Sequence, residues 1–448
     1  MNQEECICAL ATPAGGAIGI IRLSGNNAIT LTDQVFTSAS GKPLTGAKAN
    51  TLHYGEIKDK DGKTIDDVLV SVFKAPHSYT GEDSTEISCH GSRYILQQVL
   101  QRLIEVGCRQ AERGEYTRRA YMNGKMDLSQ AEAVADLIAS TNRATHQMAL
   151  SQLKGHFSNE LVSLRAKLLK MNSLLELELD FSDHEELEFA DRSQLRALAQ
   201  EIEHRINTLA QSFATGNALK QGVPVAIIGK TNVGKSTLLN RLLHEEKAIV
   251  SNIHGTTRDV IEDTTIIAGI TFRFIDTAGI RQTSDEVERI GIERTFQKMN
   301  EARIVIWLLD ETPSAEEIEE MKANNQGKKL LLVYNKMDSL VLPADQLHIS
   351  ARTGQNIHLL EEALVEAADI PEITENDVII TNARHYEALL RADDSLQRVL
   401  ESMDMEMSGD IIAEDLRMVL EELGEITGGQ ISSQETLNNI FKHFCIGK

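Results

Sequence analysis

GKTNVGKS, at Gly229–Ser236, is the segment from which the architecture of this chain can be worked out. It fits the pattern G-x-x-x-x-G-K-[ST], in which glycines let backbone N–H groups approach phosphate oxygens without a clashing Cβ. The apolar run VAIIG leads into it and the helical pattern STLLNRLL continues from it, which is the strand, loop and helix context that the pattern requires. The segment therefore predicts a phosphate-binding loop, with Lys235 at the β- and γ-phosphates of a nucleotide and Ser236 as a Mg²⁺ ligand.

Three further short motifs follow in order, each at the end of an apolar strand. DTAG contributes Asp276, expected in the Mg²⁺ shell, and Gly279, whose N–H is expected at the γ-phosphate. NKMD ends in Asp338, whose carboxylate can accept two hydrogen bonds from the N1–H and 2-amino groups of guanine, which adenine does not offer. SAR, Ser350–Arg352, is expected to contact the guanine carbonyl through its backbone. Each motif is weak alone, but together in this order they predict a GTP-binding domain.

A polar segment, SNIHGTTRD, lies between the first two motifs at Ser251–Asp259. A nucleotide-sensing switch at this place needs a threonine hydroxyl on Mg²⁺. By spacing alone, Thr256 and Thr257 are both candidates, and a flexible polar loop is the alternative to a switch.

The position that follows DTAG departs from Ras-like GTPases, in which a glutamine there orients the attacking water. This chain has Ile280, and an aliphatic side chain cannot polarise water. An arginine finger contributes roughly 10³–10⁵ in rate, so a substitute must stabilise charge to a comparable degree. Arg281 and Arg258 are possible fingers, a monovalent cation held by Asn232 is a second possibility, and Glu288 is an acidic group that could orient water.

The hydrophobic patterning divides the chain into three domains, as a length of 448 residues also suggests. Residues 1–118 are mixed and rich in strand patterns, which predicts an α+β domain. Residues 119–215 and 381–448 have helical periodicity and are expected to form one helical bundle. Residues 216–380 alternate strands with helices, which predicts an inserted, Ras-like, doubly wound sheet. The predicted class is therefore a multidomain α/β protein.

Composition constrains the partners and the compartment. Lys+Arg is 45 and Asp+Glu is 67, a formal net charge of −22, so an RNA contact would need a local basic patch or a partner protein. The 5 cysteines are irregularly spaced, as is typical of reduced thiols in a cytosol. The N-terminus lacks the pattern of a signal peptide, and apolar runs such as IVIWLL are too short to span a bilayer. These features predict a cytoplasmic protein.

A cysteine near the end of a GTPase raises the question of a lipid anchor. The chain ends in CIGK, at Cys445–Lys448. A prenylation box has aliphatic residues after the cysteine and typically ends in Ser, Met, Gln, Ala, Leu or Phe, so Gly447 and Lys448 do not fit it. Stable anchoring would also need a second signal, and the preceding SSQETLNNIFKHF holds no polybasic run. The tail therefore predicts no membrane anchor.

Taken over essentially the whole length, the sequence resembles the MnmE (TrmE) family of tRNA modification GTPases, which belong to the TrmE-Era-EngA-YihA-Septin-like GTPases. One departure is Thr231, where the family usually has proline in this loop. The segments that carry the resemblance are ATPAGGAIGIIRLSG, YTGEDSTEISCHG, NGKMDLSQAEAVADLI, GKTNVGKSTLLN, GTTRDV, DTAGIRQTSDEVERIGIER, NKMD, ISARTG and FCIGK.

The resemblance implies a function and a set of partners. Members are homodimers through N-terminal domains similar to the folate-binding domains of aminomethyltransferases. With an FAD-dependent partner, MnmG (GidA), they form a heterotetramer. This complex adds an aminomethyl or carboxymethylaminomethyl group to C5 of the wobble uridine of certain tRNAs. The one-carbon unit comes from 5-formyl- or 5,10-methylene-tetrahydrofolate, and GTP hydrolysis depends on K⁺. A regulatory switch GTPase of ribosome assembly is the alternative, and a folate-dependent transferase with a vestigial GTPase domain is a third reading.

The resemblance also implies roles for residues of the GTP site. Asn232 matches a K⁺ ligand and a catalytic position, and the backbone of Ser251 and Ile253 with Thr256 completes that site. Thr257 then becomes a Mg²⁺ ligand beside Ser236, and Glu288 is the catalytic residue that orients water. The full GTP-binding set is Asn232, Val233, Gly234, Lys235, Ser236, Thr237, Ser251, Asn252, Ile253, His254, Gly255, Thr256, Thr257, Asp276, Thr277, Ala278, Gly279, Asn335, Lys336, Met337, Asp338, Ser350, Ala351 and Arg352.

A second set of matches concerns folate. Arg22, Glu86, Lys125 and the terminal Lys448 match folate-binding positions, and Cys445 matches a cysteine with a catalytic role near the folate and tRNA chemistry. From the residues alone, a surface or capping role is the commoner interpretation of the first three. The resemblance reverses that preference and implies a terminal helix that returns the tail to the folate site.

Overall fold

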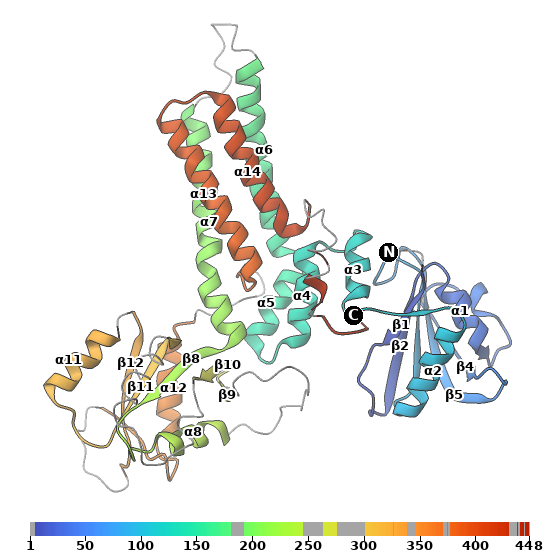
Figure 1. The fold of residues 1–448 in the computed structure, drawn as a ribbon, viewed down its shortest axis with the longest axis horizontal. Helices are drawn as coiled ribbons and strands as arrows, with labels where there is room; N and C mark the ends of the chain where they lie inside the picture. The colour runs from blue at the N-terminus through green and yellow to red at the C-terminus, as the bar shows by residue number, and fades with distance from the viewer. Residues whose placement is uncertain are drawn as a thin grey trace. The chain divides into compact units, whose positions relative to one another are not determined.

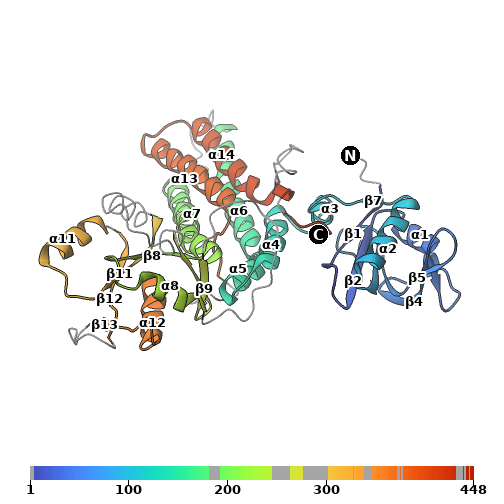
Figure 2. The ribbon, with the colours of Figure 1, turned by 60° about the horizontal axis from the view of Figure 1, so that its bottom comes forward.

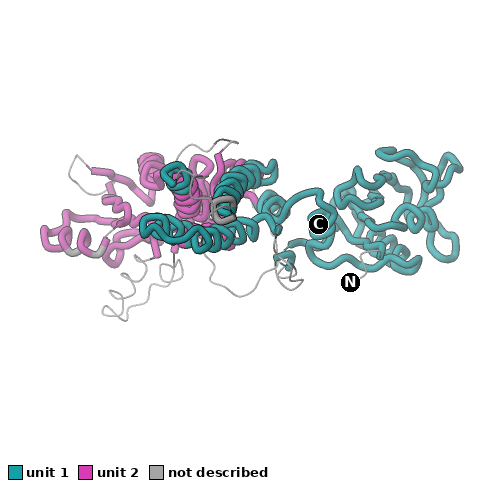
Figure 3. The backbone as a smooth tube through the Cα atoms, turned by 90° about the horizontal axis from the view of Figure 1, so that it is seen from above, with its two compact units in different colours: residues 1–139, 152–199, 395–448 teal, residues 140–151, 200–394 magenta. Residues whose placement is uncertain are grey.

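The structure is a computed structural model that describes residues 5–180, 192–244, 263–275, 301–325, 327–337, 346–370, 374, 377–429, 437, 440–442 and 444–447. The chain divides into two compact units (Figure 3). The first unit comprises Met1–Ala139, Gln152–Ala199 and Ser395–Lys448, and the second comprises Ser140–Ser151 and Gln200–Asp394. Each unit has its own sheet and core, so we describe them separately.

The first unit begins with a seven-stranded sheet in the order β3-β4-β5-β6-β2-β1-β7. Neighbouring strands are antiparallel except β1 and β7, which are parallel. The strands are β1 (Ile7–Leu10), β2 (Ile18–Ser24), β3 (Phe36–Ser38), β4 (Thr51–Lys58), β5 (Thr64–Phe73), β6 (Ser84–His90) and β7 (Arg109–Gln110).

Alternation along β5 shows how this sheet is covered. Val68, Val70 and Val72 are buried in the core, whereas the intervening Leu69 is exposed. Helices α1 (Ala28–Val35) and α2 (Arg93–Glu105) pack on the valine face (Figure 1). Because side chains alternate between the two faces of a sheet, α1 and α2 cover the valine face only, and neither covers the opposite face.

Long helices continue the first unit, as the periodicity predicted. Helix α6 packs against α14, and its buried apolar residues recur every three or four positions, among them Leu161, Leu164, Leu168, Met171 and Leu175. Helices α5, α7 and α13 contribute to both units, and α5 lies mainly in the second. The helices are α3 (Glu115–Met122), α4 (Leu128–Ala139), α5 (Arg143–Leu153), α6 (His156–Asp180), α7 (Arg192–Gln221), α13 (Ala383–Asp404) and α14 (Gly409–Thr427).

The second unit contains a six-stranded sheet in the order β13-β12-β11-β8-β10-β9. All its neighbouring strands are parallel except β9 and β10, which form a hairpin around Ala268 and Gly269. The strands are β8 (Val223–Ile228), β9 (Asp263–Ile267), β10 (Ile270–Phe274), β11 (Ile304–Leu309), β12 (Lys329–Tyr334) and β13 (Leu347–His348).

The central strands β8 and β11 are buried on both faces. Alternate residues such as Ile227 and Ile306 pack with α8 (Lys235–His244) and α12 (Ile357–Ala368). The residues between them, such as Trp307, belong to a second core that includes side chains of α11 (Ala315–Asn324; Figure 2). Strands buried on both faces need continuous apolar runs, which is the pattern that predicted them. The fold is the expected multidomain α/β class with an inserted doubly wound sheet.

Candidate functional site

The predicted GTP motifs meet at one edge of the second unit's sheet. The phosphate-binding loop follows β8, Asn335 follows β12 and Ser350 follows β13, each at the carboxyl end of a parallel strand. In open parallel sheets this edge is where ligands bind. The fold therefore collects motifs that are far apart in sequence at a single edge.

Contacts with neighbouring residues of the protein require glycine at two positions of the phosphate-binding loop. Gly229 has φ +150° and Gly234 has φ +103°, values that side chains disfavour. A Cβ on Gly229 would collide with the Leu308 carbonyl oxygen, and one on Gly234 would collide with the Asn335 amide. The glycines therefore let the loop approach the neighbouring strand ends, in addition to the phosphate contact expected from the sequence.

Lys235 and Ser236 open α8, at the positive end of the helix dipole. The Lys235 ammonium is half-buried and donates hydrogen bonds to the carbonyl oxygens of Gly229 and Lys230, both at 2.7 Å. These contacts hold the ammonium at the mouth of the loop. The arrangement has the chemistry to bind a polyphosphate, because a cation and a helix N-terminus act on the same space.

Asn335 joins two loops of this edge. Its side chain is only 3% exposed. The amide nitrogen donates to the Val233 carbonyl at 2.8 Å, and the amide oxygen accepts from the Ala351 N–H at 2.9 Å. We call this pair of contacts the Asn335 bridge. It ties the phosphate-binding loop to the segment that was expected to contact guanine.

Neighbouring residues hold the same edge. Lys336 has φ +67° and its ammonium lies 2.6 Å from an Asp310 carboxylate oxygen. The Met337 N–H donates to the Ile349 carbonyl at 3.2 Å, and Ser350 is fully buried. Asn232, by contrast, is exposed and has φ +61°. Within the part of the chain that the structure describes, its amide forms no hydrogen bond, so the oxygen is free to bind a cation.

Part of the predicted set lies outside the described residues. The described members of the GTP set are Asn232 to Thr237, Asn335 to Met337, and Ser350 to Arg352. Those outside the description are Ser251, Asn252, Ile253, His254, Gly255, Thr256, Thr257, Asp276, Thr277, Ala278, Gly279, Glu288 and Asp338, together with Arg258, Arg281 and Lys448.

A second cluster lies on the first unit's sheet. Arg22 of β2 and Glu86 of β6 are direct partners in the antiparallel register. The Arg22 Nε and Nη2 atoms lie 2.9 and 2.7 Å from one oxygen of the Glu86 carboxylate. Lys125 donates to the Pro76 carbonyl at 2.9 Å, so it contacts the loop between β5 and β6. The structure thus pairs two of the predicted folate residues and attaches the third to a neighbouring loop.

Two tyrosines that sequence reasoning missed flank Arg22. Its Cζ atom lies 5.6 Å from the ring centre of Tyr79 and 5.7 Å from that of Tyr116, distances typical of cation–π contacts. The Tyr116 hydroxyl donates to the Arg22 carbonyl at 2.6 Å, and the Tyr79 hydroxyl lies 2.9 Å from the Thr117 hydroxyl. Burial raises the pKa of Tyr79, although its side chain is still 38% exposed. Tyr79 therefore presents a fixed aromatic surface beside the Arg22–Glu86 pair.

A buried carboxylate attaches α3 to this sheet. Glu115 accepts hydrogen bonds from Arg109 at 2.6 Å and from Arg119 at 3.0 Å. Burial opposes its ionisation, but these guanidinium groups and the Glu112 N–H outweigh burial and lower the pKa of Glu115. Helix α3 also carries Tyr116, which flanks Arg22, and Thr117, whose hydroxyl contacts that of Tyr79. Because the Glu115 network attaches α3 to the sheet, it fixes the positions of both residues.

The C-terminal tail lies against the start of α3. The Gly114 N–H donates to the Cys445 carbonyl at 3.2 Å, and Arg113 pairs with Ile446 as an antiparallel bridge. Phe441 and Phe444 pack with Leu128 of α4, and Cys445 is exposed. The tail therefore lies beside the N-terminus of α3, the helix whose Tyr116 and Thr117 contact Arg22 and Tyr79. None of the helices among the described residues is long and apolar enough to cross a membrane.

Comparisons with known proteins found matching family models and similar full-length sequences. The family model described as "MnmE helical domain" matches residues 128–445, and "GTP-binding protein TrmE N-terminus" matches residues 6–125. The chain is 55% identical over 498 residues to the tRNA modification GTPase MnmE of Phocaeicola vulgatus, covering 100% of both. It is 56% identical over 469 residues to that of Bacteroides fragilis, again covering 100% of both. The crystal structure of the G domain of the T. maritima FeoB iron transporter is 24% identical, covers 33% of this chain and 99% of that chain, and has a TM-score of 0.24.

Proposed function

The chain belongs to the MnmE family of tRNA modification GTPases, and from that premise we propose that its two clusters serve one reaction on tRNA. The protein is a GTP-hydrolysing enzyme of tRNA modification. The proposed reaction adds an aminomethyl or carboxymethylaminomethyl group to C5 of the wobble uridine, with a tetrahydrofolate derivative as one-carbon donor. An FAD-dependent MnmG-type partner and a cytoplasmic location complete the proposal. The observation that carries it is one chain with a phosphate-binding edge and a separate Arg–Glu cluster joined to a thiol-bearing tail.

The described residues fit the two metal ions in part. Ser236 at the start of α8 supplies a hydroxyl for Mg²⁺, and the exposed amide of Asn232 supplies an oxygen for K⁺. The further ligands proposed from the resemblance, Thr257 for Mg²⁺ and Ser251, Ile253 and Thr256 for K⁺, lie outside the described residues. When bound, the two cations would supply positive charge against the phosphates. The chain's own part is to bind and orient the nucleotide through Lys235, and Glu288 is the proposed group that orients water.

The second cluster fits the flat heterocycle of a reduced folate. The Glu86 carboxylate is an acceptor for N–H donors, and the Arg22 guanidinium fixes its position. Tyr79 offers a partly exposed ring for stacking. Lys125 and Lys448 are proposed to bind the anionic part of the same molecule. When bound, the folate supplies the one-carbon unit, and Cys445 is the proposed thiol near that chemistry.

The reaction can be reconstituted from purified components. We expect unmodified tRNA to gain the wobble modification when the chain, the flavin partner, a tetrahydrofolate derivative, the amine and GTP are combined, as measured by nucleoside mass spectrometry. Omission of any component should abolish the product. Rapid GTP turnover in the complete mixture with no modified uridine would favour a regulatory switch GTPase instead.

Replacing Tyr79 with alanine is expected to weaken tetrahydrofolate binding roughly 5- to 150-fold, because stacking on an aromatic ring contributes about 1–3 kcal/mol. Tyr79→Phe keeps the ring and loses only the contact with Thr117, so it should bind nearly as tightly as the unchanged chain. Fluorescence titration of the full chain with 5-formyl-tetrahydrofolate measures this, and GTP affinity checks that the variants are folded. Unchanged folate binding in Tyr79→Ala would remove this ring from the proposed site.

The face of the first sheet that α1 and α2 leave uncovered, part of which Tyr116 of α3 covers at β1, supports the proposed homodimer. Leu52 and Tyr54 of β4 are 60% and 58% exposed, and Tyr54 is the direct register partner of the exposed Leu69 on β5. Leu52, Ser71, Glu86 and Arg22 follow one another across the strands, so the apolar residues share a face with the Arg22–Glu86 pair. Adjacent exposed apolar side chains mark association surfaces. We therefore assign the dimer contact to this face.

Tyr54→Asp places a charge in this face and is expected to shift the protein from dimer to monomer at micromolar concentration. Multi-angle light scattering after size exclusion gives the mass directly. Tyr94→Asp is the matched control, since Tyr94 is 71% exposed but lies on α2, which covers the other face. A dimer that survives Tyr54→Asp, or that Tyr94→Asp disrupts equally, would place the contact elsewhere.

A further inference from the structure

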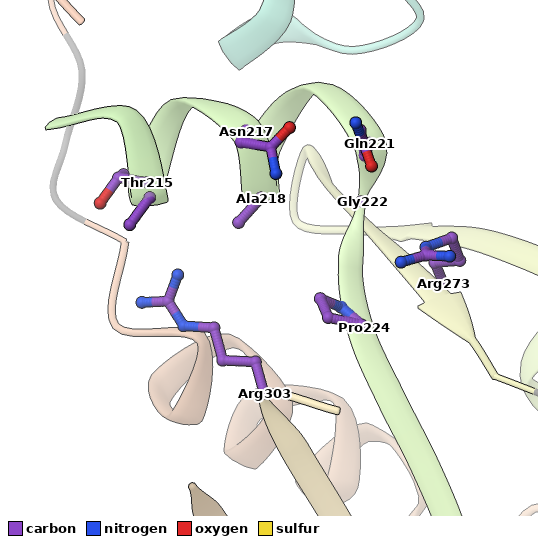
Figure 4. A pocket seen from close by; sticks show the side chains of 9 residues that line it. Thr215, Asn217, Ala218, Gln221, Gly222, Pro224, Arg273 and Arg303 are labelled. Carbon is purple, nitrogen blue, oxygen red and sulfur yellow. The ribbon is translucent and has the colours of Figure 1, made fainter. Parts of the chain in front are cut away.

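A cavity in the second unit lies at the opposite end of β8 from the phosphate-binding loop. Its volume is about 310 Å³, within the range of small-molecule sites. It is lined by the last turns of α7, by the start of β8 and by Arg273 and Arg303 (Figure 4). Since β8 runs from Val223 at this cavity to Ile228, just before the loop, the cavity is separate from the nucleotide edge.

Two arginines reach this cavity from the strands on either side of β8. Arg273 of β10 is the register partner of Pro224, and the Arg303 N–H donates to the Pro224 carbonyl at 2.9 Å. Figure 4 shows the Arg303 side chain extending from the start of β11 toward the Thr215 and Asn217 side chains of α7. The sheet order β11-β8-β10 thus places two cations around one central strand end.

The lining is rich in donors, and none of the described residues that form it carries a carboxylate. The amide groups of Asn217 and Gln221 and the Thr215 hydroxyl add to the two guanidinium groups. Arg303 takes part in no side-chain hydrogen bond or ion pair with the described residues. A guanidinium is best satisfied by two oxygens of a planar or tetrahedral anion. The protein carries a net charge of −22, so an anion would be drawn here only by such a local arrangement.

The C-terminal end of α7 offers a simpler explanation of the cations, because the negative end of a helix dipole attracts them. That explanation predicts guanidinium contacts with the last carbonyl groups of α7. Arg303 makes no such contact, although its side chain points toward this helix (Figure 4). Small residues, Ala218 and Gly222 among them, leave open space between the cations and the helix. The open volume, rather than the helix end, is therefore what faces the Arg303 guanidinium.

We propose that this cavity binds a small molecule carrying a phosphate or carboxylate group, with Arg303 as its main charge partner. The bound anion would link α7 to the N-terminal ends of β8 and β11. The site does not depend on the proposed reaction, since it shares no residue with either cluster described above.

The test uses the full chain saturated with GDP and Mg²⁺, so that the diphosphate occupies the phosphate-binding loop. Isothermal titration with pyrophosphate in one arm and citrate in the other separates a phosphate from a carboxylate ligand. We expect one saturable site for at least one anion, and Arg303→Gln should weaken it about tenfold or more, as for other bonds to charged groups. Ala214→Leu, a change at an exposed position of the rim, should also weaken binding without altering charge.

Lys329→Gln is the matched control. Lys329 is exposed and its N–H donates to the Arg303 carbonyl at 3.1 Å, so the substitution removes one nearby positive charge outside the lining. We expect it to leave anion affinity unchanged, and all variants should keep the affinity for GDP. Absence of saturable binding, unchanged binding in Arg303→Gln, or equal losses in Arg303→Gln and Lys329→Gln would each overturn the proposal.

Discussion

Asn335→Ala is expected to abolish tight GTP binding and to lower the free energy of unfolding by roughly 2–6 kcal/mol, because two buried groups lose their partner at about 1–3 kcal/mol each. The groups are the Val233 carbonyl and the Ala351 N–H, which the Asn335 bridge satisfies at 2.8 and 2.9 Å. Once the bridge is gone, the phosphate-binding loop and the Ser350–Arg352 segment are no longer held together. Affinity for a fluorescent GTP analogue and thermal unfolding of the full chain measure the two effects.

Two further substitutions separate this explanation from a general loss of packing. Asn335→Asp keeps an acceptor for the Ala351 N–H but places a carboxylate oxygen against the Val233 carbonyl, so its GTP affinity should also fall. Asn356→Gly removes a 3.0 Å bond to the His348 carbonyl and a weaker 3.4 Å contact with the Met337 sulfur in the same region, and it suits the φ of +60° there. It should retain GTP binding. Wild-type affinity in Asn335→Ala would show that the bridge is dispensable.

The sequence was sufficient to predict the sheet of the second unit. Strands β8 and β11 are buried on both faces, so each is one unbroken apolar run, and the motifs follow directly at the strand ends. The part played by Asn335 was not predicted. As part of NKMD it belongs to the predicted GTP-binding set, yet its amide contacts residues 102 and 16 positions away along the chain. Local patterns contain no information about such contacts.

The contacts of the second cluster were even less predictable from local sequence patterns. Arg22 and Glu86 are 64 positions apart and meet only because β2 and β6 pair in one register. Tyr79 and Tyr116 reach Arg22 from a loop and from α3, and no spacing rule relates the three. The return of the tail was expected only from the resemblance. The predicted boundaries at residues 118, 215 and 380 stay predictions, and the contact-based division runs through α5, α7 and α13.

GTP turnover is expected to be at least tenfold faster in KCl than in NaCl at equal ionic strength. The reason is Ile280, which replaces the water-orienting glutamine and leaves charge stabilisation to another group. An arginine finger contributes roughly 10³–10⁵ in rate, and a bound cation must supply a comparable effect. Asn232, exposed in the loop and without a hydrogen bond from its amide to the described residues, is the proposed ligand. Initial rates of phosphate release in the two salts measure the ratio.

Substitutions at Asn232 distinguish the amide from the backbone that carries it. Its φ of +61° is costly for alanine but natural for glycine, so Asn232→Gly removes the amide while it preserves the loop. If the amide binds the cation, Asn232→Gly should bind GTP normally and lose the KCl stimulation. Thr231→Ala, at the adjacent exposed position, should keep the stimulation. Equal rates of the unchanged chain in KCl and NaCl would contradict the cation mechanism and turn attention to Arg281 and Arg258. Stimulation that persists in Asn232→Gly would leave the cation in place and assign its binding to other oxygens of the site.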